Sequence, residues 1–252
     1  LAAAVAVAGD ADCIALAGVA QMLGRQYAQY ATPEMLWAAA ANGYAQGADG
    51  FAIADACTLP NGWPWTDREY GTLRLLGHPD LLATADKRYR LRSDPRGGAS
   101  AGGWLPGLTP ALPQTLVEGE PLELRLRIAD DLPRWHALGK VNSVRLRVRL
   151  TNIEPSLNKL RVELNGRILP DTMLELNDLT YRLRKLGPVS PYGYDYQYEL
   201  GPDHYPRRGH NTLKVTIVER DPNVAFSIDV YDVDCCIGYD LHRHFRDAPI
   251  DY

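Results

Sequence analysis

One carboxylate and two indoles stand close together in the sequence, in a segment rich in turn-forming residues. Asp55 follows the apolar run GFAIA, and Trp63 and Trp65 flank Pro64 a little further along. A carboxylate can hydrogen-bond a ligand hydroxyl or exchange a proton with it, and an indole face packs on apolar C–H groups such as those of a pyranose ring. The same indoles bury equally well against protein, and Asp55 is equally suited to cap its loop. The segment is a candidate ligand site, with loop packing as the alternative.

A histidine pair near the end of the chain is a weaker pattern. His242 and His244 would share one face of an extended strand, so both imidazoles could reach one metal ion, and Asp232 and Asp234 precede them. No third ligand follows at a compelling spacing, so we predict a solvated segment and no metal site. The sequence has no P-loop, no GxGxxG after a strand and no HExxH. We therefore predict no cofactor.

Arginine alternates with apolar residues along several predicted strands. The arginines concerned are Arg125, Arg127, Arg145, Arg147, Arg149 and Arg161. A cationic stripe of this kind could meet an acidic polysaccharide, because guanidinium pairs bidentately with carboxylate or sulfate. Glu123 and Glu163 fall on the same face, however, and cross-strand ion pairs explain the stripe without a ligand.

The positive and negative charges of the chain nearly balance, so the protein has no overall positive potential that would attract a polyanion. There are 27 Lys and Arg residues against 31 Asp and Glu, for a formal net charge of −4, so we predict no nucleic-acid partner. The hydrophobic share of 46% and the charged share of 23% are ordinary for a globular protein. Four cysteines without a CxxC pair are too few for a disulfide scaffold and leave the compartment open.

The chain opens on an apolar stretch, LAAAVAVAGDADCIALAGVA. Asp10 and Asp12 interrupt it, no basic region precedes it, and neither half reaches the roughly 20 residues that span a bilayer. We predict no membrane span and no signal peptide here, but a buried strand at 13–20 and a further one at 2–8. If the strand at 2–8 forms, both aspartates lie at its C-terminal end as site candidates; otherwise they are turn residues.

The rest of the first half alternates helix and strand signals. Thr32 and Pro33 are the N-cap and first-turn residues of a predicted helix through EMLWAAAANGYAQ, which Gly47 ends. GFAIADA at 50–56 follows as a buried strand and DREYGTLRLLG at 67–77 as a second helix. Apolar strands joined by amphipathic helices are typical of a parallel α/β sheet.

The second half reads as a series of short strands. Apolar residues alternate with charged ones at 122–128 and 144–150, and Asn165-Gly166 predicts a tight hairpin. Further strands are predicted at 194–200, 211–219 and 226–239. About seven such strands indicate an antiparallel β-sandwich, jelly-roll or immunoglobulin-like. Tyr194, Tyr196 and Tyr198 would share one face of their strand, as an interface or a sugar platform.

Two segments resemble a known family. NGYAQGADGFAIADA, an aromatic-rich loop and LRLLGHPDLLATADKRY together resemble the last helix, last strand and closing helix of the (β/α)8 barrel in bacterial glycoside-hydrolase-like proteins, over about residues 32 to 92. Asp55 stands where that pattern leads us to expect asparagine. The runs LRVELNGRIL and GHNTLKVTI are similar to accessory β-sandwiches appended to such barrels.

The resemblance implies α/β plus all-β architecture in a C-terminal fragment, because a complete barrel takes about 250 residues. The predicted domains are the C-terminal end of a TIM barrel at 1–92, a Gly- and Pro-rich linker at 93–114, an antiparallel β-sandwich at 115–245 and a tail at 246–252. The parent protein would be a glycoside hydrolase acting on poly- or oligosaccharide, and its compartment could be extracytoplasmic.

The resemblance also implies roles for individual residues. Asp55, Trp63 and Trp65 would contribute to a substrate-binding wall, with Asp55 a weak catalytic candidate. Glycoside hydrolysis needs a pair of carboxylates, and here they would lie mostly upstream of this sequence, so we expect the fragment itself to be inactive. The alternative is a non-catalytic carbohydrate-binding or structural β-sandwich protein.

Overall fold

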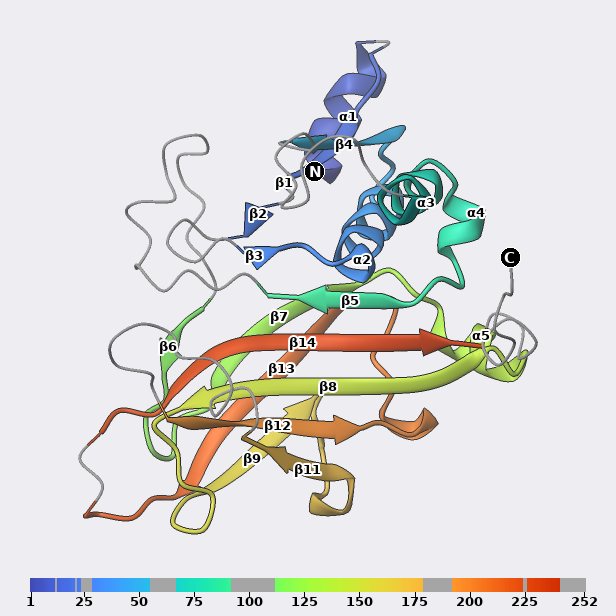
Figure 1. The fold of residues 1–252 in the computed structure, drawn as a ribbon. Helices are drawn as coiled ribbons and strands as arrows, with labels where there is room; N and C mark the ends of the chain where they lie inside the picture. The colour runs from blue at the N-terminus through green and yellow to red at the C-terminus, as the bar shows by residue number, and fades with distance from the viewer. Residues whose placement is uncertain are drawn as a thin grey trace. The chain divides into compact units, whose positions relative to one another are not determined.

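The computed structural model describes residues 1–11, 13–20, 22–23, 29–54, 67–91, 112–178, 192–223 and 226–240. The chain folds into two compact units (Figure 1). Unit 1 comprises Leu1–Tyr89, Ile128–Asn142 and Ile237–Tyr252, and unit 2 comprises Arg90–Arg127 and Ser143–Cys236. Unit 1 is therefore built from three separate stretches of the sequence. The predicted domain boundaries at 92, 114 and 245 stay a prediction.

Unit 1 begins with a mixture of short helices and strands. Its elements in the first stretch are α1 (Ala2–Asp10), β1 (Leu16–Ala20), β2 (Met22–Leu23), β3 (Gln29–Tyr30), α2 (Pro33–Tyr44), β4 (Gly50–Ala54), α3 (Asp67–Leu76), α4 (Pro79–Leu82) and β5 (Lys87–Arg90). A short helix, α5 (Leu132–Ala137), lies in the second stretch. β1 and β4 pair in parallel, with Leu16 opposite Gly50 and Ala20 opposite Ala54. The predicted strands and helices are present in order as β1, α2, β4 and α3, but a short antiparallel pair, β2 with β3, stands between β1 and α2.

The strand predicted at 2–8 is wrong, because these residues form helix α1. Alanine has the highest helix propensity of all residues, and the stretch is mostly alanine. None of the helix residues is buried, so no core contact draws this apolar run into a sheet. Asp10 is the last residue of α1 and is exposed, so the strand-end site considered for it does not form.

Helix α2 packs closely against strand β1 and helix α3. Thr32 and Pro33 hold the predicted N-cap and N1 positions, and Gly47 has a φ of +87°, which ends the helical turn. Tyr44 donates its hydroxyl hydrogen to the carbonyl of Leu76, at 2.7 Å. A Cβ placed on Gly43 would lie 2.7 Å from the Cβ of Ala17, so only glycine allows this approach of helix to strand.

Unit 2 contains most of the antiparallel sheets. Its elements are β6 (Gln114–Thr115), β7 (Leu122–Ile128), β8 (Val141–Thr151), β9 (Lys159–Leu164), β10 (Arg167–Ile168), η3 (Asp171–Met173), β11 (Leu174–Asn177), β12 (Gly193–Glu199), η4 (Pro202–His204), β13 (Gly209–Glu219) and β14 (Asp229–Tyr239), with the ends of β7, β8 and β14 reaching unit 1. One sheet has the order β10-β9-β13-β7, and a second has the order β11-β12-β8-β14-β5 with β6 beside β14 (Figure 1).

The period-two pattern decides which face of each strand is buried. Along β8, Val144, Leu146, Val148 and Leu150 are buried, whereas the alternate arginines are more accessible. The predicted hairpin is confirmed: β9 and β10 pair antiparallel, and Asn165 and Gly166 between them have φ values of 53° and 80°. Two positive φ values in a two-residue loop match the right-handed twist of the strands. The strands predicted in the second half are therefore present, mostly in antiparallel sheets.

Candidate functional site

The predicted ligand residues fall outside the part of the chain that the structure describes. Strand β4 ends at Ala54, directly before Asp55, and neither the position of Asp55 nor those of Trp63 and Trp65 are described. The same holds for His242 and His244. Within the described ranges, no group of three or more His, Cys, Asp or Glu residues is arranged to hold a metal ion. Across those same ranges, no helix has the length and apolar character to cross a membrane.

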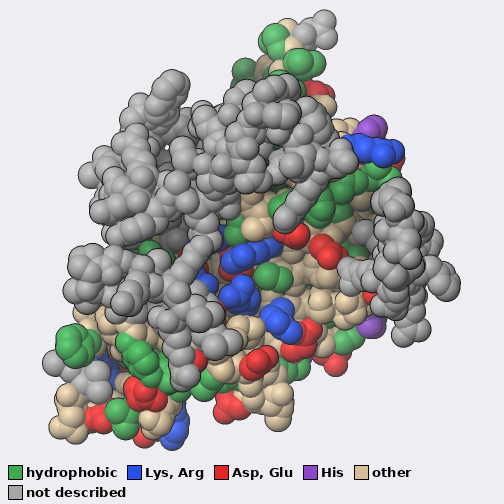
Figure 2. Space-filling view, in the orientation of Figure 1, with side chains coloured by type: hydrophobic (Ala, Val, Ile, Leu, Met, Phe, Trp, Pro, Cys, Tyr) green, Lys and Arg blue, Asp and Glu red, His purple; other side chains and the backbone are tan. Residues whose placement is uncertain are grey.

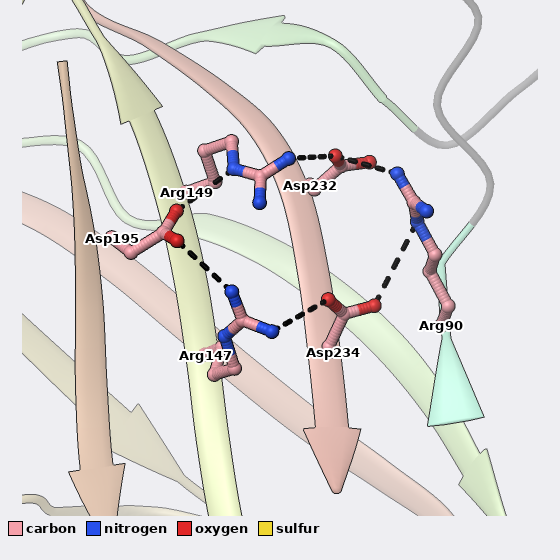
Figure 3. Close-up of polar contacts among 6 residues, drawn as sticks. All are labelled: Arg90, Arg147, Arg149, Asp195, Asp232 and Asp234. Atoms are coloured by element: carbon pink, nitrogen blue, oxygen red, sulfur yellow. Dashed lines mark hydrogen bonds and ion pairs between the residues drawn. The ribbon is translucent and has the colours of Figure 1, made fainter. Parts of the chain in front are cut away.

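Three arginines and three aspartates of unit 2 form a closed ionic ring on one face of the larger sheet (Figure 3). The pairs, in order around the ring, are Arg149–Asp195 (2.8 Å), Asp195–Arg147 (2.9 Å), Arg147–Asp234 (3.9 Å), Asp234–Arg90 (3.7 Å), Arg90–Asp232 (2.6 Å) and Asp232–Arg149 (3.0 Å). Every member thus faces two groups of opposite charge. We call these six residues the ionic ring.

Strand register builds the ionic ring. Arg147 and Arg149 are two apart on β8, so both lie on the face opposite the buried Val148. The antiparallel pairing of β12 with β8 places Asp195 directly across from Arg149. β14 neighbours β8 on its other side and supplies Asp232 and Asp234, again two residues apart.

The ionic ring is charge-balanced and largely closed to water. Its carboxylates are 3% exposed and its guanidiniums 15–22%. Burial raises the pKa of Asp195, but the hydrogen bonds and charges of Arg149 and Arg147 outweigh burial and hold that pKa below its ordinary value. Figure 2 shows the same mixture of signs, with basic and acidic side chains together over β8 and β14. The ring therefore offers no net field to an anionic ligand.

The predicted arginine stripe does not form as one surface. Arg125 and Arg127 lie on β7 and Arg161 on β9, in the smaller sheet, while the other three lie on β8. Most of them pair with acidic side chains as in the ligand-free explanation: Arg145 with Glu199 at 2.9 Å and Arg161 with Glu163 at 3.0 Å, besides the ring itself. The alternating arginines are visible in the sequence, but the carboxylates that pair with them are determined by the order of the strands in the sheet.

A second polar cluster is buried in unit 1. The Asp130 carboxylate accepts hydrogen bonds from Lys87 Nζ at 2.8 Å, from the Tyr89 hydroxyl at 2.5 Å and from the Tyr239 hydroxyl at 2.6 Å. Desolvation lowers the pKa of Lys87 despite the charge of Asp130, and it raises the pKa of Tyr89. The Lys87 and Asp130 side chains are both 1% exposed. A ligand has no access to such groups, so we assign this cluster a structural role.

The predicted tyrosine face is mostly interior, with one ring at its end open to solvent. Tyr196 and Tyr198 pair with Val148 and Leu146 and are buried, so they form no sugar platform. Tyr192, just before β12, is 49% exposed. Its ring packs edge-to-face on Tyr194, with centroids 5.5 Å apart. Tyr192, which lies just outside the strand, is therefore the exposed tyrosine of this segment.

Hydrogen bonds fix Tyr192 to the loop that joins β8 to β9. Its hydroxyl lies 2.6 Å from that of Tyr194 and donates to Glu154 Oε2 at 3.0 Å. Ser156 donates through Oγ to Glu154 Oε1, at 3.0 Å. The amide of Asn152, which has a φ of 57°, donates to the Tyr192 carbonyl. We call Asn152, Glu154, Ser156, Tyr192 and Tyr194 the Tyr192 cluster.

The acidity of the Tyr192 cluster follows from these bonds. Partial burial raises the pKa of Glu154, but hydrogen bonds from Tyr192 and Ser156 outweigh it and leave the pKa below its ordinary value. The hydrogen bond with Tyr194 and then desolvation raise the pKa of Tyr192. Because an ionised carboxylate only accepts, the proton order is Tyr194 to Tyr192 to Glu154. The cluster thus joins an open aromatic ring to a fixed anionic acceptor.

Two comparisons with known proteins were negative. No family model matches the chain, and no curated protein matches it either.

Proposed function

We propose that the chain is the C-terminal part of a glycoside-hydrolase-like protein that contacts carbohydrate. Residues 1–92 would be the end of a (β/α)8 barrel, and the antiparallel sheets an appended β-sandwich. The observation that carries the proposal is that β1 and β4 pair in parallel, with helix α2 between them in the sequence and helix α3 after β4. This order is the repeating unit of such a barrel.

The exposure of β1 supports the same proposal. Leu16 is 53% exposed and Ile14, two residues earlier, is 76% exposed. In a closed barrel each strand has a neighbour on both sides, and such apolar side chains are covered. Within the described ranges β1 pairs only with β4. Additional barrel strands of the parent protein would cover this edge.

The chemistry follows from the position of β4. Barrel enzymes hold their ligands at the C-terminal ends of the strands, and Asp55 directly follows β4. Asp55, Trp63 and Trp65 would form part of the subsite wall, with the carboxylates that cleave the glycosidic bond supplied by other strands. The chain itself would bind carbohydrate without hydrolysing it.

Variants of these three residues test the proposal by two measurements on each. Trp63→Ala, Trp65→Ala and Asp55→Asn should each weaken glycan binding by about 1 to 3 kcal/mol, as loss of an aromatic platform or a charged acceptor does, with little change in melting temperature. If the tryptophans are packed instead, their loss should destabilise the protein by about 3 to 5 kcal/mol without an intrinsic change in affinity. That second pattern would remove the subsite.

A non-catalytic carbohydrate-binding β-sandwich is the second candidate, and the Tyr192 cluster favours it. The cluster presents an aromatic ring and a carboxylate within unit 2. The two candidates differ in the parent protein. Hydrolysis of a glycan that depends on carboxylates of upstream barrel strands supports the first, and binding without hydrolysis supports the second.

A further inference from the structure

One asparagine at the end of the larger sheet bonds the backbone at, or next to, two exposed aromatic residues. Asn152 donates its backbone amide hydrogen to the carbonyl of Tyr192 and its side-chain amide hydrogen, through Nδ2, to the carbonyl of Ser227 at 3.0 Å. Phe226 precedes Ser227 and is 72% exposed. Tyr192 and Ser227, the residue after Phe226, are therefore bonded to the same turn, in which Asn152 adopts a left-handed conformation.

The Tyr192 ring is ordered before any ligand arrives. A surface tyrosine usually rotates freely, but here the hydroxyl bonds Glu154 and Tyr194, and the ring packs edge-to-face against Tyr194. Fixing a side chain in advance lowers the entropy cost of binding. Half of the surface of Tyr192 stays open nevertheless. An open aromatic ring held by hydrogen bonds suits a ligand that packs flat against it.

The polar groups beside this ring suit hydroxyl donors. An ionised carboxylate offers about four acceptor positions, and Glu154 uses three of them, for the Tyr192 hydroxyl and for the hydroxyl and amide of Ser156. One position on Oε2 remains for a ligand hydroxyl. The Ser156 hydroxyl, which donates to Glu154, can still accept.

The charge beside Tyr192 disfavours an acidic ligand on that ring. Glu154 carries a negative charge next to Tyr192, whereas Arg220 donates to the carbonyl of Phe226 at 2.8 Å and keeps its positive charge there. A carboxylate or sulfate on the ligand would meet Glu154 at short range. An uncharged ligand with apolar C–H faces and hydroxyls can pack on both rings and donate a hydroxyl hydrogen to Glu154 without electrostatic repulsion.

We propose that the Tyr192 cluster and Phe226 form a binding site for a neutral pyranose oligosaccharide. One sugar ring packs on Tyr192 and gives a hydroxyl hydrogen to Glu154, and a neighbouring unit packs on Phe226. This inference rests on the proposed function, because it names the surface through which unit 2 contacts carbohydrate.

Isothermal titration of the full chain tests the site. The probes are neutral pentasaccharides built of glucose, xylose or mannose, with a pentagalacturonate as the acidic comparison. Tyr192→Ala should weaken binding of a neutral probe about tenfold or more, the loss expected for one stacked ring. Phe226→Ala, which removes a ring in open solvent and leaves folding intact, should weaken it about threefold to tenfold. Trp135→Ala, a partly exposed aromatic in unit 1, is the matched control and should leave affinity unchanged.

The outcomes separate this site from the proposed function. If the wild type binds a neutral probe and both Tyr192→Ala and Phe226→Ala bind it equally well, the site is wrong while carbohydrate binding stands. Equal losses in Trp135→Ala and in the two site variants also overturn it, because the effect is then not local. Preference for pentagalacturonate overturns the neutral ligand class. If the wild type binds none of the probes, this site and carbohydrate contact through unit 2 fall together.

Discussion

Replacing Asp195 by asparagine should cost unit 2 a measurable part of its stability. The carboxylate accepts hydrogen bonds from Arg149 at 2.8 Å and Arg147 at 2.9 Å and is 3% exposed. Asparagine keeps the shape and one acceptor but leaves the ionic ring with an excess positive charge. Breaking a buried ion pair costs about 3 to 5 kcal/mol. Because water reaches the two guanidiniums, we expect a lower loss, about 2 to 3 kcal/mol in the free energy of unfolding.

Urea unfolding at neutral pH measures this loss, and Glu199→Gln is the matched control. Glu199 lies on the same strand as Asp195 and also pairs with an arginine of β8, Arg145, at 2.9 Å. The two side chains of that pair are 48% and 46% exposed, and solvent screens them. The control should therefore change stability by only about 0 to 1 kcal/mol. An unchanged dependence on urea concentration in both variants shows that stability alone has changed.

The pH dependence gives an independent check. The folded-state pKa of Asp195 lies below its ordinary value of 3.8. The stability that this group contributes is therefore fully present above the unfolded-state pKa and is lost as the pH falls through the lowered folded-state pKa. The difference between wild type and Asp195→Asn should stay constant from about pH 7 to 5 and shrink below about pH 4. A neutral-pH loss under about 1 kcal/mol, or a difference that does not shrink in acid, would refute the coupling that we assign to the ring.

Two further changes probe unit 1, both by urea unfolding. Asp130→Asn should destabilise it by about 3 to 5 kcal/mol, because the buried Lys87 ammonium loses the carboxylate that it bonds; a loss below about 1 kcal/mol would contradict a buried ion pair. Gly43→Ala should cost about 1 to 3 kcal/mol, since the new Cβ meets Ala17 at 2.7 Å. In Gly71→Ala on α3 the new Cβ has nothing within 4 Å, so this control should stabilise by about 0.5 to 1 kcal/mol, and equal effects of both alanines would disprove the close contact.

Local signals in the sequence predicted the elements whose causes are local. Asn165 and Gly166 determine their hairpin because the turn itself requires positive φ. Thr32 and Pro33 mark the start of α2 for a similar reason. The run at 2–8 was ambiguous, since a short apolar run fits either a strand or a helix by periodicity alone. Its alanine content favours the helix that forms.

Contacts that depend on strand order could not be predicted. Arg147 and Arg149 are visible in the sequence as an alternating pair, but their partners follow from β8 lying between β12 and β14. Asp232 was considered beside a histidine pair, whereas it bonds Arg149 from 83 residues away. Tyr194, Tyr196 and Tyr198 were predicted to share one face, whereas the exposed ring is that of Tyr192, which lies just before β12. The alternation of residue types along a strand predicts which face of the sheet a side chain lies on, whereas the order and pairing of the strands decide which side chain lies next to it.

Unit 1 is built from residues that the ribosome makes early and residues that it makes late, so its folding must wait for the later ones. The Asp86 carboxylate receives the backbone amide hydrogen of Tyr239 at 2.8 Å, across 153 residues of chain. At a translation rate of about 5 to 20 residues per second, the ribosome makes Tyr239 about 8 to 30 s after Asp86. Once Asp130 has been made it can bond Lys87 and Tyr89, but it lacks the Tyr239 hydroxyl until the end of that time. Unit 1 can therefore complete these hydrogen bonds only after Tyr239 has been made.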